Sequence, residues 1–287
     1  MSDYTNLLNN RWDKYTSTGN DGIIEHILKT INIKKGIFVE FGAWDGIKNS
    51  NCRKLFEEKW EGVFIEGDID KYRKLKNNYR NSKNIYCLNS RVGFKEEELF
   101  DNLVDPFLNN SNIDFCSIDI DGLDLEVFET FEKYLPTVIC IEGGQMLPPY
   151  YGRIKKTLAK HNIQQSLQTM VNSFEEKGYK ILCSYQDSFF IKKESYDKFN
   201  AELNLVKLYF NGLKSIPRRM PFIQKYTKKV GLKNKIVNEV LIKTNYKKYG
   251  WEKRKIWIHK NKKIVLKKLN ELETIEKEKY SQGDKHY

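Results

Sequence analysis

Four predicted strands of this 287-residue chain end in a carboxylic acid. Short apolar runs lead into Glu40, Glu66, Asp119 and Glu142, and a further acid, Asp121, follows two residues after the third of these. The carboxyl ends of neighbouring parallel strands meet at one edge of a sheet, where α/β proteins bind their ligands. Carboxylates gathered at such an edge can bind cationic groups, accept hydrogen bonds from hydroxyls and take a proton from a reacting hydroxyl.

The elements that position the first two acids are indicated by residues 36–68, which follow a strand, tight turn, helix and strand pattern. This is the first half of a nucleotide-binding α/β sheet, but the third glycine of a dinucleotide motif is missing, and Asp45 lies in the turn near Glu40. Two carboxylates there would repel a pyrophosphate at low effective dielectric. S-adenosylmethionine instead carries an ammonium and a sulfonium, and its ribose hydroxyls can bind Glu66. The charge pattern therefore favours this cofactor.

Three motifs in this part of the chain resemble those of the FkbM-type S-adenosylmethionine-dependent methyltransferases, many of which act on sugars. The motifs are VEFGAWDG, NSNC and GVFIEGD, and the resemblance extends from about Gly19 to Lys193. It implies a class I methyltransferase fold: a Rossmann-like α/β/α sandwich with a mainly parallel seven-stranded sheet. Two apolar runs at residues 179–184 and 188–192, joined by a very short turn, predict the terminal antiparallel hairpin that completes this fold.

The pattern and the resemblance together define the residues that we expect to bind S-adenosylmethionine. We expect Glu66 to accept hydrogen bonds from both ribose hydroxyls, and the polar residues after the third strand to lie where an adenine ring would be placed. The full set is Glu40, Gly42, Ala43, Asp45, Gly46, Ser50, Asn51, Glu66, Asn89, Ser90 and Asp119. Ser50 or Asn51 is also expected to cap the helix that follows.

A second segment, IDFCSIDIDGLDLEVFETF, resembles the DxDG segment at the fourth strand of this family. We expect Asp119 and Glu142 to orient the acceptor, directly or through Mg²⁺, which prefers hard oxygen ligands. Asp121 or His161 is expected to accept the proton, and Asp124 to cap the next helix. The alternative is that Asp119 and Asp121 only cap the turn and the following helix.

Charge divides the chain into two parts. Residues 205–287 contain 23 Lys and Arg against 7 Asp and Glu, whereas residues 1–204 contain 27 against 31. We therefore expect a methyltransferase domain over residues 1–204 and a basic helical region over 205–287. The asymmetry suggests an anionic membrane surface or polyanion as partner, with nucleic acid less favoured. A helical cap or dimerisation element with a solvated basic surface explains the same composition.

The C-terminal part of the sequence lacks the alternating strand and helix pattern of the first part. Helices are expected over residues 195–211, 222–246 and 253–280, with the proline-bracketed linker IPRRMP at residues 216–221.

Cysteine usage and hydropathy indicate a cytoplasmic protein that could contact the membrane peripherally. The five cysteines are unevenly spaced without a CxxC pair, and the chain contains neither a signal peptide nor an apolar run of eighteen residues.

The function that we expect is O-methylation of a sugar hydroxyl of a surface glycan or its precursor, a step of polysaccharide biosynthesis. The prediction that the acceptor is a sugar rests on the family resemblance alone. A nucleic-acid methyltransferase using the basic region, and a binding module that keeps the fold without catalysis, are the alternatives. The sequence leaves homo-oligomerisation open.

Overall fold

The computed structural model describes residues 7–108, 110–155, 163–201, 204–243, 258 and 260–281. His161 lies outside the described residues, as do parts of the three helices expected in the C-terminal region, at 202–203, at 244–246 and at 253–257 with 259. No helix in the described part of the chain combines the length and the apolar character needed to cross a membrane.

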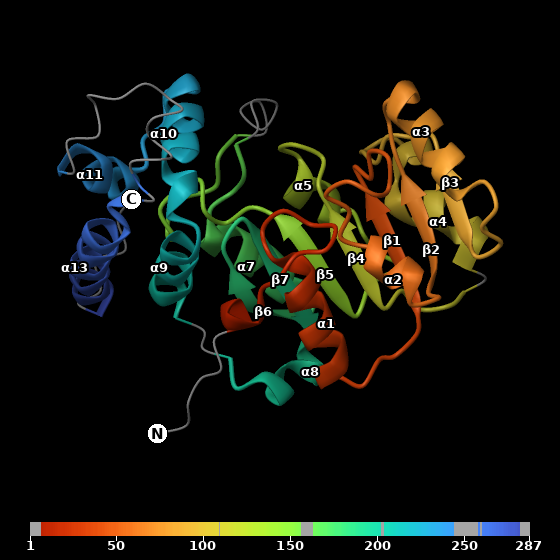
Figure 1. The fold of residues 1–287 in the computed structure, drawn as a ribbon, viewed down its shortest axis with the longest axis horizontal. Helices are drawn as coiled ribbons and strands as arrows, with labels where there is room; N and C mark the ends of the chain where they lie inside the picture. Colours follow the sequence, from red (N-terminus) through yellow and green to blue (C-terminus); the bar gives the residue numbers. More distant parts are fainter. Residues whose placement is uncertain are drawn as a thin grey trace.

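Seven strands form one sheet in the order β3-β2-β1-β4-β5-β7-β6 (Figure 1). The first five strands are parallel, and β7 pairs antiparallel with both β5 and β6. This is the mainly parallel sheet with a terminal hairpin of the class I methyltransferase fold, so the predicted fold class is confirmed. The strands are β1 (Ile37–Phe41), β2 (Glu61–Ile65), β3 (Ile85–Leu88), β4 (Phe115–Ile118), β5 (Val138–Glu142), β6 (Tyr179–Ser184) and β7 (Asp187–Lys192).

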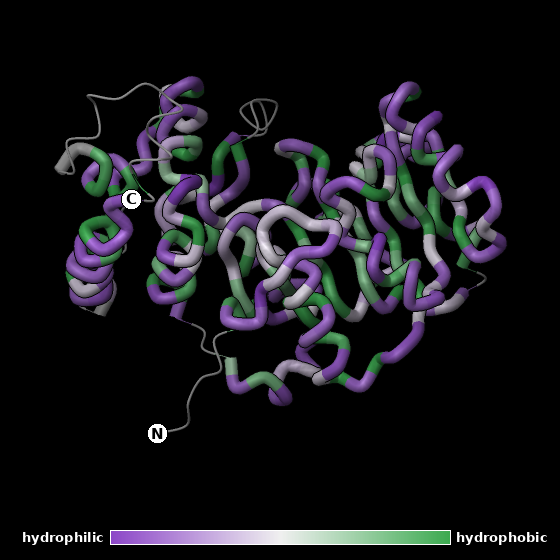
Figure 2. The backbone as a smooth tube through the Cα atoms, in the orientation of Figure 1, coloured by the Kyte–Doolittle hydropathy of each residue, from purple (hydrophilic) through white to green (hydrophobic). Residues whose placement is uncertain are grey.

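Helices cover both faces of the sheet, because each strand is apolar on both sides. On β1, Phe38 packs in one cluster of buried side chains while Val39 and Phe41 pack in another. Figure 2 shows the hydrophobic segments concentrated in the strands. The first cluster includes residues of α1 (Asn20–Thr30), α2 (Arg53–Glu57) and α3 (Ile69–Tyr79). The second includes residues of α4 (Phe100–Leu108), α5 (Asp124–Phe128) and α7 (Leu167–Glu176).

Stacked aromatic rings fix the second helix layer. The rings of Phe100 and Phe131 are 3.8 Å apart, those of Phe128 and Phe174 3.7 Å, and those of Phe174 and Phe190 3.6 Å, centroid to centroid. They join α4, α5 and α7 to β7. Such ring pairs add about 0.5–1.5 kcal/mol each beyond their buried area. The helix layer on this face of the sheet is therefore firmly packed, next to the strands whose turns carry Asp119 and Glu142.

The C-terminal helices pack against the end of the sheet. Helix α9 (Leu205–Ser215) contacts β6 and α7, and α13 (Lys262–Ser281) contacts α9. Tyr209, Phe210 and Leu269 are buried in the same cluster as the sheet. The other elements of this region are η4 (Pro217–Arg219), α10 (Met220–Lys229) and α11 (Lys235–Lys243).

Three expectations for this region are corrected by the structure. The helix expected over residues 195–211 is interrupted at Asn200, which adopts a left-handed φ of 43° between a short helical segment, α8 (Lys193–Tyr196) with η3 (Asp197–Phe199), and α9. The side chain of Asn204 then caps α9 by accepting the backbone N–H of Lys207 at 2.9 Å. The linker at 216–221 is helical, and the helix expected over 222–246 is divided near Gly231, whose φ is 76°.

Candidate cofactor and acceptor site

A cavity of about 630 Å³ opens at the carboxyl edge of the sheet, where the strand order reverses between β1 and β4. Its volume is that of a small-molecule site. It is lined by Glu40, Phe41, Gly42, Ala43, Trp44, Lys48, Asn49, Ser50, Asn51, Ile65, Glu66, Gly67, Asp68, Lys71, Ser90, Arg91, Val92, Asp119, Ile120, Asp121 and Leu123.

Most of the residues expected to bind the cofactor lie on this wall: Glu40, Gly42, Ala43, Ser50, Asn51, Glu66, Ser90 and Asp119. The other three hold the loops behind it. Asp45 accepts the backbone N–H groups of Ile47 and Lys48, the carbonyl of Gly46 accepts the hydroxyl of Tyr79, and the amide of Asn89 donates to the carbonyl of Glu66. These three residues are not part of the cavity lining.

Glu40 is buried beneath the cavity with its hydrogen bonds already arranged. Its carboxylate accepts the hydroxyl of Ser50 at 2.5 Å and the backbone N–H of Asn51 at 2.8 Å. Ser50 in turn accepts the N–H of Arg53 at 3.0 Å, but the expectation that Ser50 or Asn51 caps the helix is not met, because Cys52 holds the N-cap position of α2 without a side-chain cap. Burial raises the pKa of Glu40 to about 7, although these hydrogen bonds work in the opposite direction. The residue therefore changes charge close to neutral pH.

Glu66 is held in one orientation by backbone groups on both sides. One oxygen accepts the N–H of Trp44 at 2.7 Å, and the other accepts the N–H of Asp68 at 2.8 Å. Each carboxylate oxygen can accept two hydrogen bonds, so each keeps one acceptor position. A pair of neighbouring hydroxyls on a bound ribose fits those two positions.

Gly42 allows the turn after β1 to approach the end of β4. Its φ is 73°, and a Cβ added there would lie 1.7 Å from the carbonyl oxygen of Asp119. Only glycine fits this contact without moving one of the two chains. The close approach places Asp119 in the same cavity as Glu40 and Glu66.

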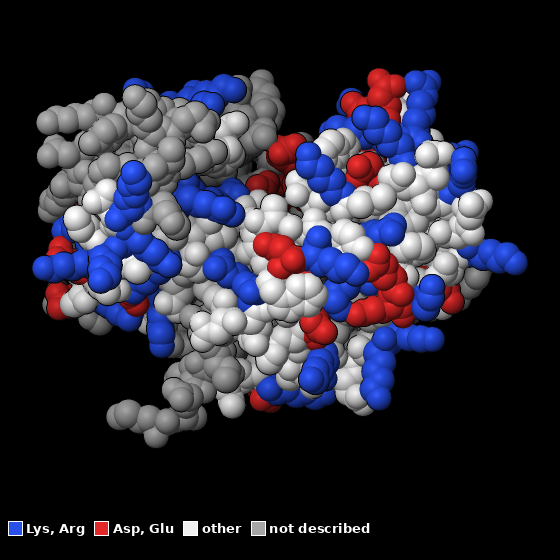
Figure 3. Space-filling model, in the orientation of Figure 1, with Lys and Arg blue, Asp and Glu red and all other residues white. Residues whose placement is uncertain are grey.

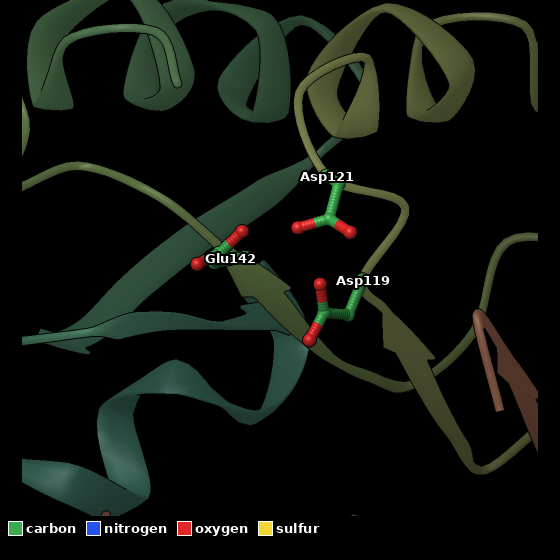
Figure 4. Close-up of side chains that lie close together, drawn as sticks. All are labelled: Asp119, Asp121 and Glu142. Carbon is green, nitrogen blue, oxygen red and sulfur yellow. The ribbon is translucent and has the colours of Figure 1, made fainter. Parts of the chain in front are cut away.

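Asp119, Asp121 and Glu142 form an acid cluster next to the cavity. Figure 4 shows the three carboxylates close together at the ends of β4 and β5, and one oxygen from each lies within 4.8 Å of the others. Asp121 adopts a left-handed φ of 61°. Asp119 and Asp121 also line the cavity, so the cofactor and acceptor regions adjoin.

The turn between β4 and α5 is organised by Asp124. Its carboxylate accepts the N–H groups of Ile120 and Gly122, each at 2.8 Å. The expectation that Asp124 caps α5 is wrong: it is the first residue of the helix, and no side chain caps the position before it. Its hydrogen bonds instead fix the loop that carries Asp121.

Burial and nearby carboxylates raise the pKa values of Asp119 and Glu142 in this cluster, and burial raises that of the neighbouring Asp124. The pKa of Asp119 is well above its usual value because protein surrounds the carboxyl and Glu142 lies close, although Asp119 remains exposed towards the cavity. Burial, followed by the nearby Asp124 and Asp187, raises the pKa of Glu142 to about 8, and burial raises that of Asp124 to about 6. Glu142 is therefore mainly protonated near neutral pH and can share its proton with a hydroxyl placed beside it.

Two partners of Glu142 were not anticipated from the sequence. Gln164 donates to one oxygen at 2.7 Å, and the guanidinium of Arg219 lies 3.8 Å from the other. Burial lowers the pKa of Arg219, and the carboxylates of Glu142 and Asp187 work against that shift. The Nε of Arg219 is buried without a hydrogen-bond partner in the described part of the chain. The sequence signal for Arg219 was the pair of arginines in IPRRMP, a segment that we interpreted as a linker.

Asn20, the first residue of α1, connects the cavity to the C-terminal hairpin. Its amide donates to Asn51 at 2.8 Å and to Asp187 at 2.7 Å. Asn51 donates to the hydroxyl of Ser117 at 2.9 Å. The start of α1 is therefore tied to β4, to β7 and to the cavity wall.

The acid cluster has the donor chemistry of a hard divalent cation. The three carboxylates each offer one oxygen, and these oxygens lie within 4.8 Å of one another. The described residues contain no other such group of His, Cys, Asp and Glu. Magnesium prefers oxygen ligands of this kind, and its charge would stabilise the ionised carboxylates. Arg219 supplies competing positive charge on one side of Glu142.

Comparison with protein-family models gives no match, and neither does a search of the curated proteins. Solved structures give matches to methyltransferases. A caffeoyl-CoA O-methyltransferase from Staphylococcus aureus, so described, has a TM-score of 0.42 at 12% identity, covering 64% of this chain and 87% of its own. TrmK from M. capricolum, in complex with S-adenosyl-homocysteine, also has a TM-score of 0.42 at 12% identity, covering 85% and 96%. A SAM dependent methyltransferase from Aquifex aeolicus has 0.38 at 14%, covering 58% and 86%. Because these TM-scores are below 0.5, we take neither activity nor substrate from them.

Proposed function

We propose that this protein transfers the methyl group of S-adenosylmethionine to an oxygen, and that the acceptor is a sugar hydroxyl of a surface glycan or its precursor. The observation that carries the proposal is the position of Asp119, which belongs both to the cavity and to the acid cluster. A cofactor in the cavity would therefore have its reactive end beside Asp121, the proton acceptor of our proposal, and beside the carboxyl groups of Asp119 and Glu142. The sugar is supported by the resemblance of the sequence motifs.

The cavity complements the charges of this cofactor. The two free acceptor positions of Glu66 suit the ribose hydroxyls, and Glu40 supplies negative charge near a sulfonium or ammonium. Lys48, Lys71 and Arg91 are exposed residues of the same cavity and suit the carboxylate of the amino-acid part. Asp119 lines the same cavity as Glu40 and Glu66 and also belongs to the acid cluster on the acceptor side.

In the reaction the acceptor oxygen forms a bond to the methyl carbon while the bond from that carbon to sulfur breaks, and the sulfur keeps the electron pair. The hydroxyl must lose its proton as it attacks. Asp121 accepts that proton in our proposal, and Asp119 and Glu142 hold neighbouring hydroxyls of the acceptor. If Mg²⁺ binds, Asp119 and Glu142 would hold it, and its charge would lower the pKa of the acceptor hydroxyl.

The proposal is tested by measuring S-adenosylhomocysteine release with a panel of sugar nucleotides and glycans. Asp121→Asn and Glu142→Gln should lower turnover by about 10²-fold, the lower range for loss of a general base, while cofactor affinity is retained. Asp70→Asn, an exposed acid of α3, is the matched control and should retain full turnover. A chelator should lower turnover only if a metal takes part.

Two outcomes would contradict the mechanism. Full activity in both Asp121→Asn and Glu142→Gln would remove the acid cluster from the chemistry. Absence of product with every sugar acceptor, despite cofactor binding, would remove the sugar assignment.

A further inference from the structure

A second cavity of about 630 Å³ lies between the N-terminal loop and the C-terminal helices. One wall is formed by residues 11–13 and 17–19, which precede α1. The opposite wall is formed by residues 215–218, at the junction of α9 and η4, together with Ile258, Lys260 and Lys262. Its volume suits a small molecule or one end of a larger one.

The charge of this cavity is strongly positive. Arg11, Arg218, Lys260 and Lys262 line it, and the single acid on its wall is Asp13. The carboxylate of Asp13 already accepts the hydroxyl of Thr16 and the N–H of Gly19, each at 2.5 Å. Asp13 is therefore engaged within its own loop, and the cations lack a matching set of acids on the cavity wall.

Arg11 is held in place before any ligand binds. Its guanidinium donates to the hydroxyl of Ser215 at 3.3 Å and to the carbonyl of Ser215 at 3.2 Å, and it lies 5.4 Å from the ring centroid of Tyr185. Its Nε is buried without a hydrogen-bond partner among the described residues. A fixed guanidinium loses little conformational entropy when it binds a phosphate.

An aromatic ring stands beside these cations. Trp12 lines the cavity and is 40% exposed, one of the few large hydrophobic side chains with that much accessible surface. A sugar or base ring can stack on such a surface while an attached phosphate meets the cations. The combination favours a phosphorylated ring compound over a free inorganic anion.

The cavity is linked to the acid cluster through both of its walls. Arg218 lines the cavity, and the next residue, Arg219, lies beside Glu142. Gly19 lines it on the other side, and the next residue, Asn20, is hydrogen-bonded to Asp187. Residues on both walls are thus adjacent in sequence to residues that contact Glu142 or Asp187, its partner across β5 and β7.

We propose that this cavity binds the phosphate or pyrophosphate group of the methyl acceptor, which makes the acceptor a glycosyl phosphate or a sugar nucleotide. This identification of the acceptor rests on the proposed methyl transfer, whereas the phosphate site itself does not. An extended nucleic acid is disfavoured by the cavity's size. On the visible described surface in Figure 3, Lys and Arg are interspersed with uncharged and acidic residues.

The phosphate site is tested by calorimetry on the full-length protein with inorganic pyrophosphate and UDP at low salt. The variant pair Arg218→Gln with Lys262→Gln should weaken both dissociation constants at least tenfold. The control pair Lys228→Gln with Lys229→Gln removes the same charge from the exposed end of α10 and should change them less than twofold. UDP should bind more tightly than pyrophosphate, and Trp12→Ala should remove that difference.

Failure of this site is distinguishable from failure of the proposed function. Titration with S-adenosylhomocysteine tests the first cavity separately and should give the same affinity in both pairs of variants. The Arg218→Gln, Lys262→Gln pair should raise KM for a sugar nucleotide and leave KM for the unphosphorylated sugar unchanged. No binding of pyrophosphate or UDP to the wild-type protein, or equal weakening in both pairs, would overturn the phosphate site.

Discussion

At the scale of single residues, the site is governed by carboxyl groups whose pKa values the surrounding protein raises. Burial is the main cause that raises the pKa of each of Glu40, Asp119 and Glu142. Among the described residues, the nearby Arg219 lies within salt-bridge distance of Glu142 alone of these three acids. A buried acid without a full counter-charge favours its protonated form. Each of them would become ionised more readily when a cationic ligand arrives.

This argument predicts a pH dependence of cofactor binding. With a pKa of about 7, Glu40 is mainly protonated at pH 6 and mainly ionised at pH 8 in the free protein. A cationic ligand stabilises the ionised form and lowers its pKa, so affinity should rise with pH. A decrease of about one unit on binding corresponds to about a fivefold rise in affinity between pH 6 and pH 8, within a limit of about tenfold over the whole titration. Calorimetry with S-adenosylmethionine from pH 6 to pH 8 measures it.

Glu40→Gln is the control, because the cofactor's own amino group also titrates and contributes equally to both proteins. The difference between wild-type protein and variant isolates the carboxyl. Equal pH dependence in the two proteins would show that Glu40 does not interact with the cofactor's charge.

The acids at the strand ends were predictable because each directly follows an apolar run of the sequence. Arg219 and Gln164 were not, since their contact with Glu142 depends on how distant segments pack. Asp124 shows a third case: its position before an apolar helix suggested a cap, but the close turn offered it the N–H groups of Ile120 and Gly122 instead.

At the scale of elements, the C-terminal helices act as a covering layer of the sheet. Helix α9 buries Tyr209, Phe210 and Leu213 in the main cluster, and α13 adds Val265 and Leu269. Asn234, just before α11, donates to the carbonyl of Met146, and the ring of Tyr280 lies 3.9 Å from that of Tyr150. This packing favours the helical-cap interpretation of the basic region. An anionic membrane or polyanion partner, and the domain division at residue 204, remain proposals.

The covering role predicts the effect of deleting residues 214–287. The deletion removes α10, α11 and α13, so the apolar side chains of α9 lose their cover and Glu142 loses Arg219. We expect an insoluble protein, or one whose free energy of unfolding falls by several kcal/mol, since each large buried side chain contributes about 1.5–3 kcal/mol. Urea denaturation of any soluble fraction measures the loss.

The matched control replaces two exposed lysines of α13, Lys263 and Lys267, by glutamine in the full-length chain, which should leave the midpoint of denaturation unchanged. A soluble truncated protein with wild-type stability would contradict the covering role and favour a separate basic appendage.

The boundaries of the terminal hairpin were predictable from the sequence, whereas those of the C-terminal helices were not. The terminal hairpin was located correctly because both of its strands are apolar and the turn between them is short. The helix expected over 195–211 failed because Asn200 adopts a left-handed conformation, which the helical periodicity of the sequence does not reveal. The linker at 216–221 failed because Pro217 and Pro221 both lie in first turns of helical segments, where proline is tolerated.

At the scale of the whole molecule, three parts of the chain meet at the carboxyl edge of the sheet. The strand turns supply the first cavity, the segment before α1 supplies Arg11, the first residue of α1 is Asn20, and the C-terminal region supplies Arg218 and Arg219. The sheet and the first cavity were predictable because their residues are close in sequence or repeat the same strand-end pattern. The second cavity was not, because its walls are about two hundred residues apart, as the contact between Arg11 and Ser215 shows.

The central claim is that the first cavity binds S-adenosylmethionine through Glu66, and calorimetry with S-adenosylhomocysteine tests it most directly. The wild-type protein should bind this product and should bind NAD more weakly. Glu66→Ala should weaken binding at least tenfold, because each charge-assisted hydrogen bond to a ribose hydroxyl contributes about 1.5–3 kcal/mol. Thermal unfolding of the variant shows whether it remains folded. Unchanged affinity in folded Glu66→Ala, or tighter binding of NAD than of S-adenosylhomocysteine, would contradict the assignment.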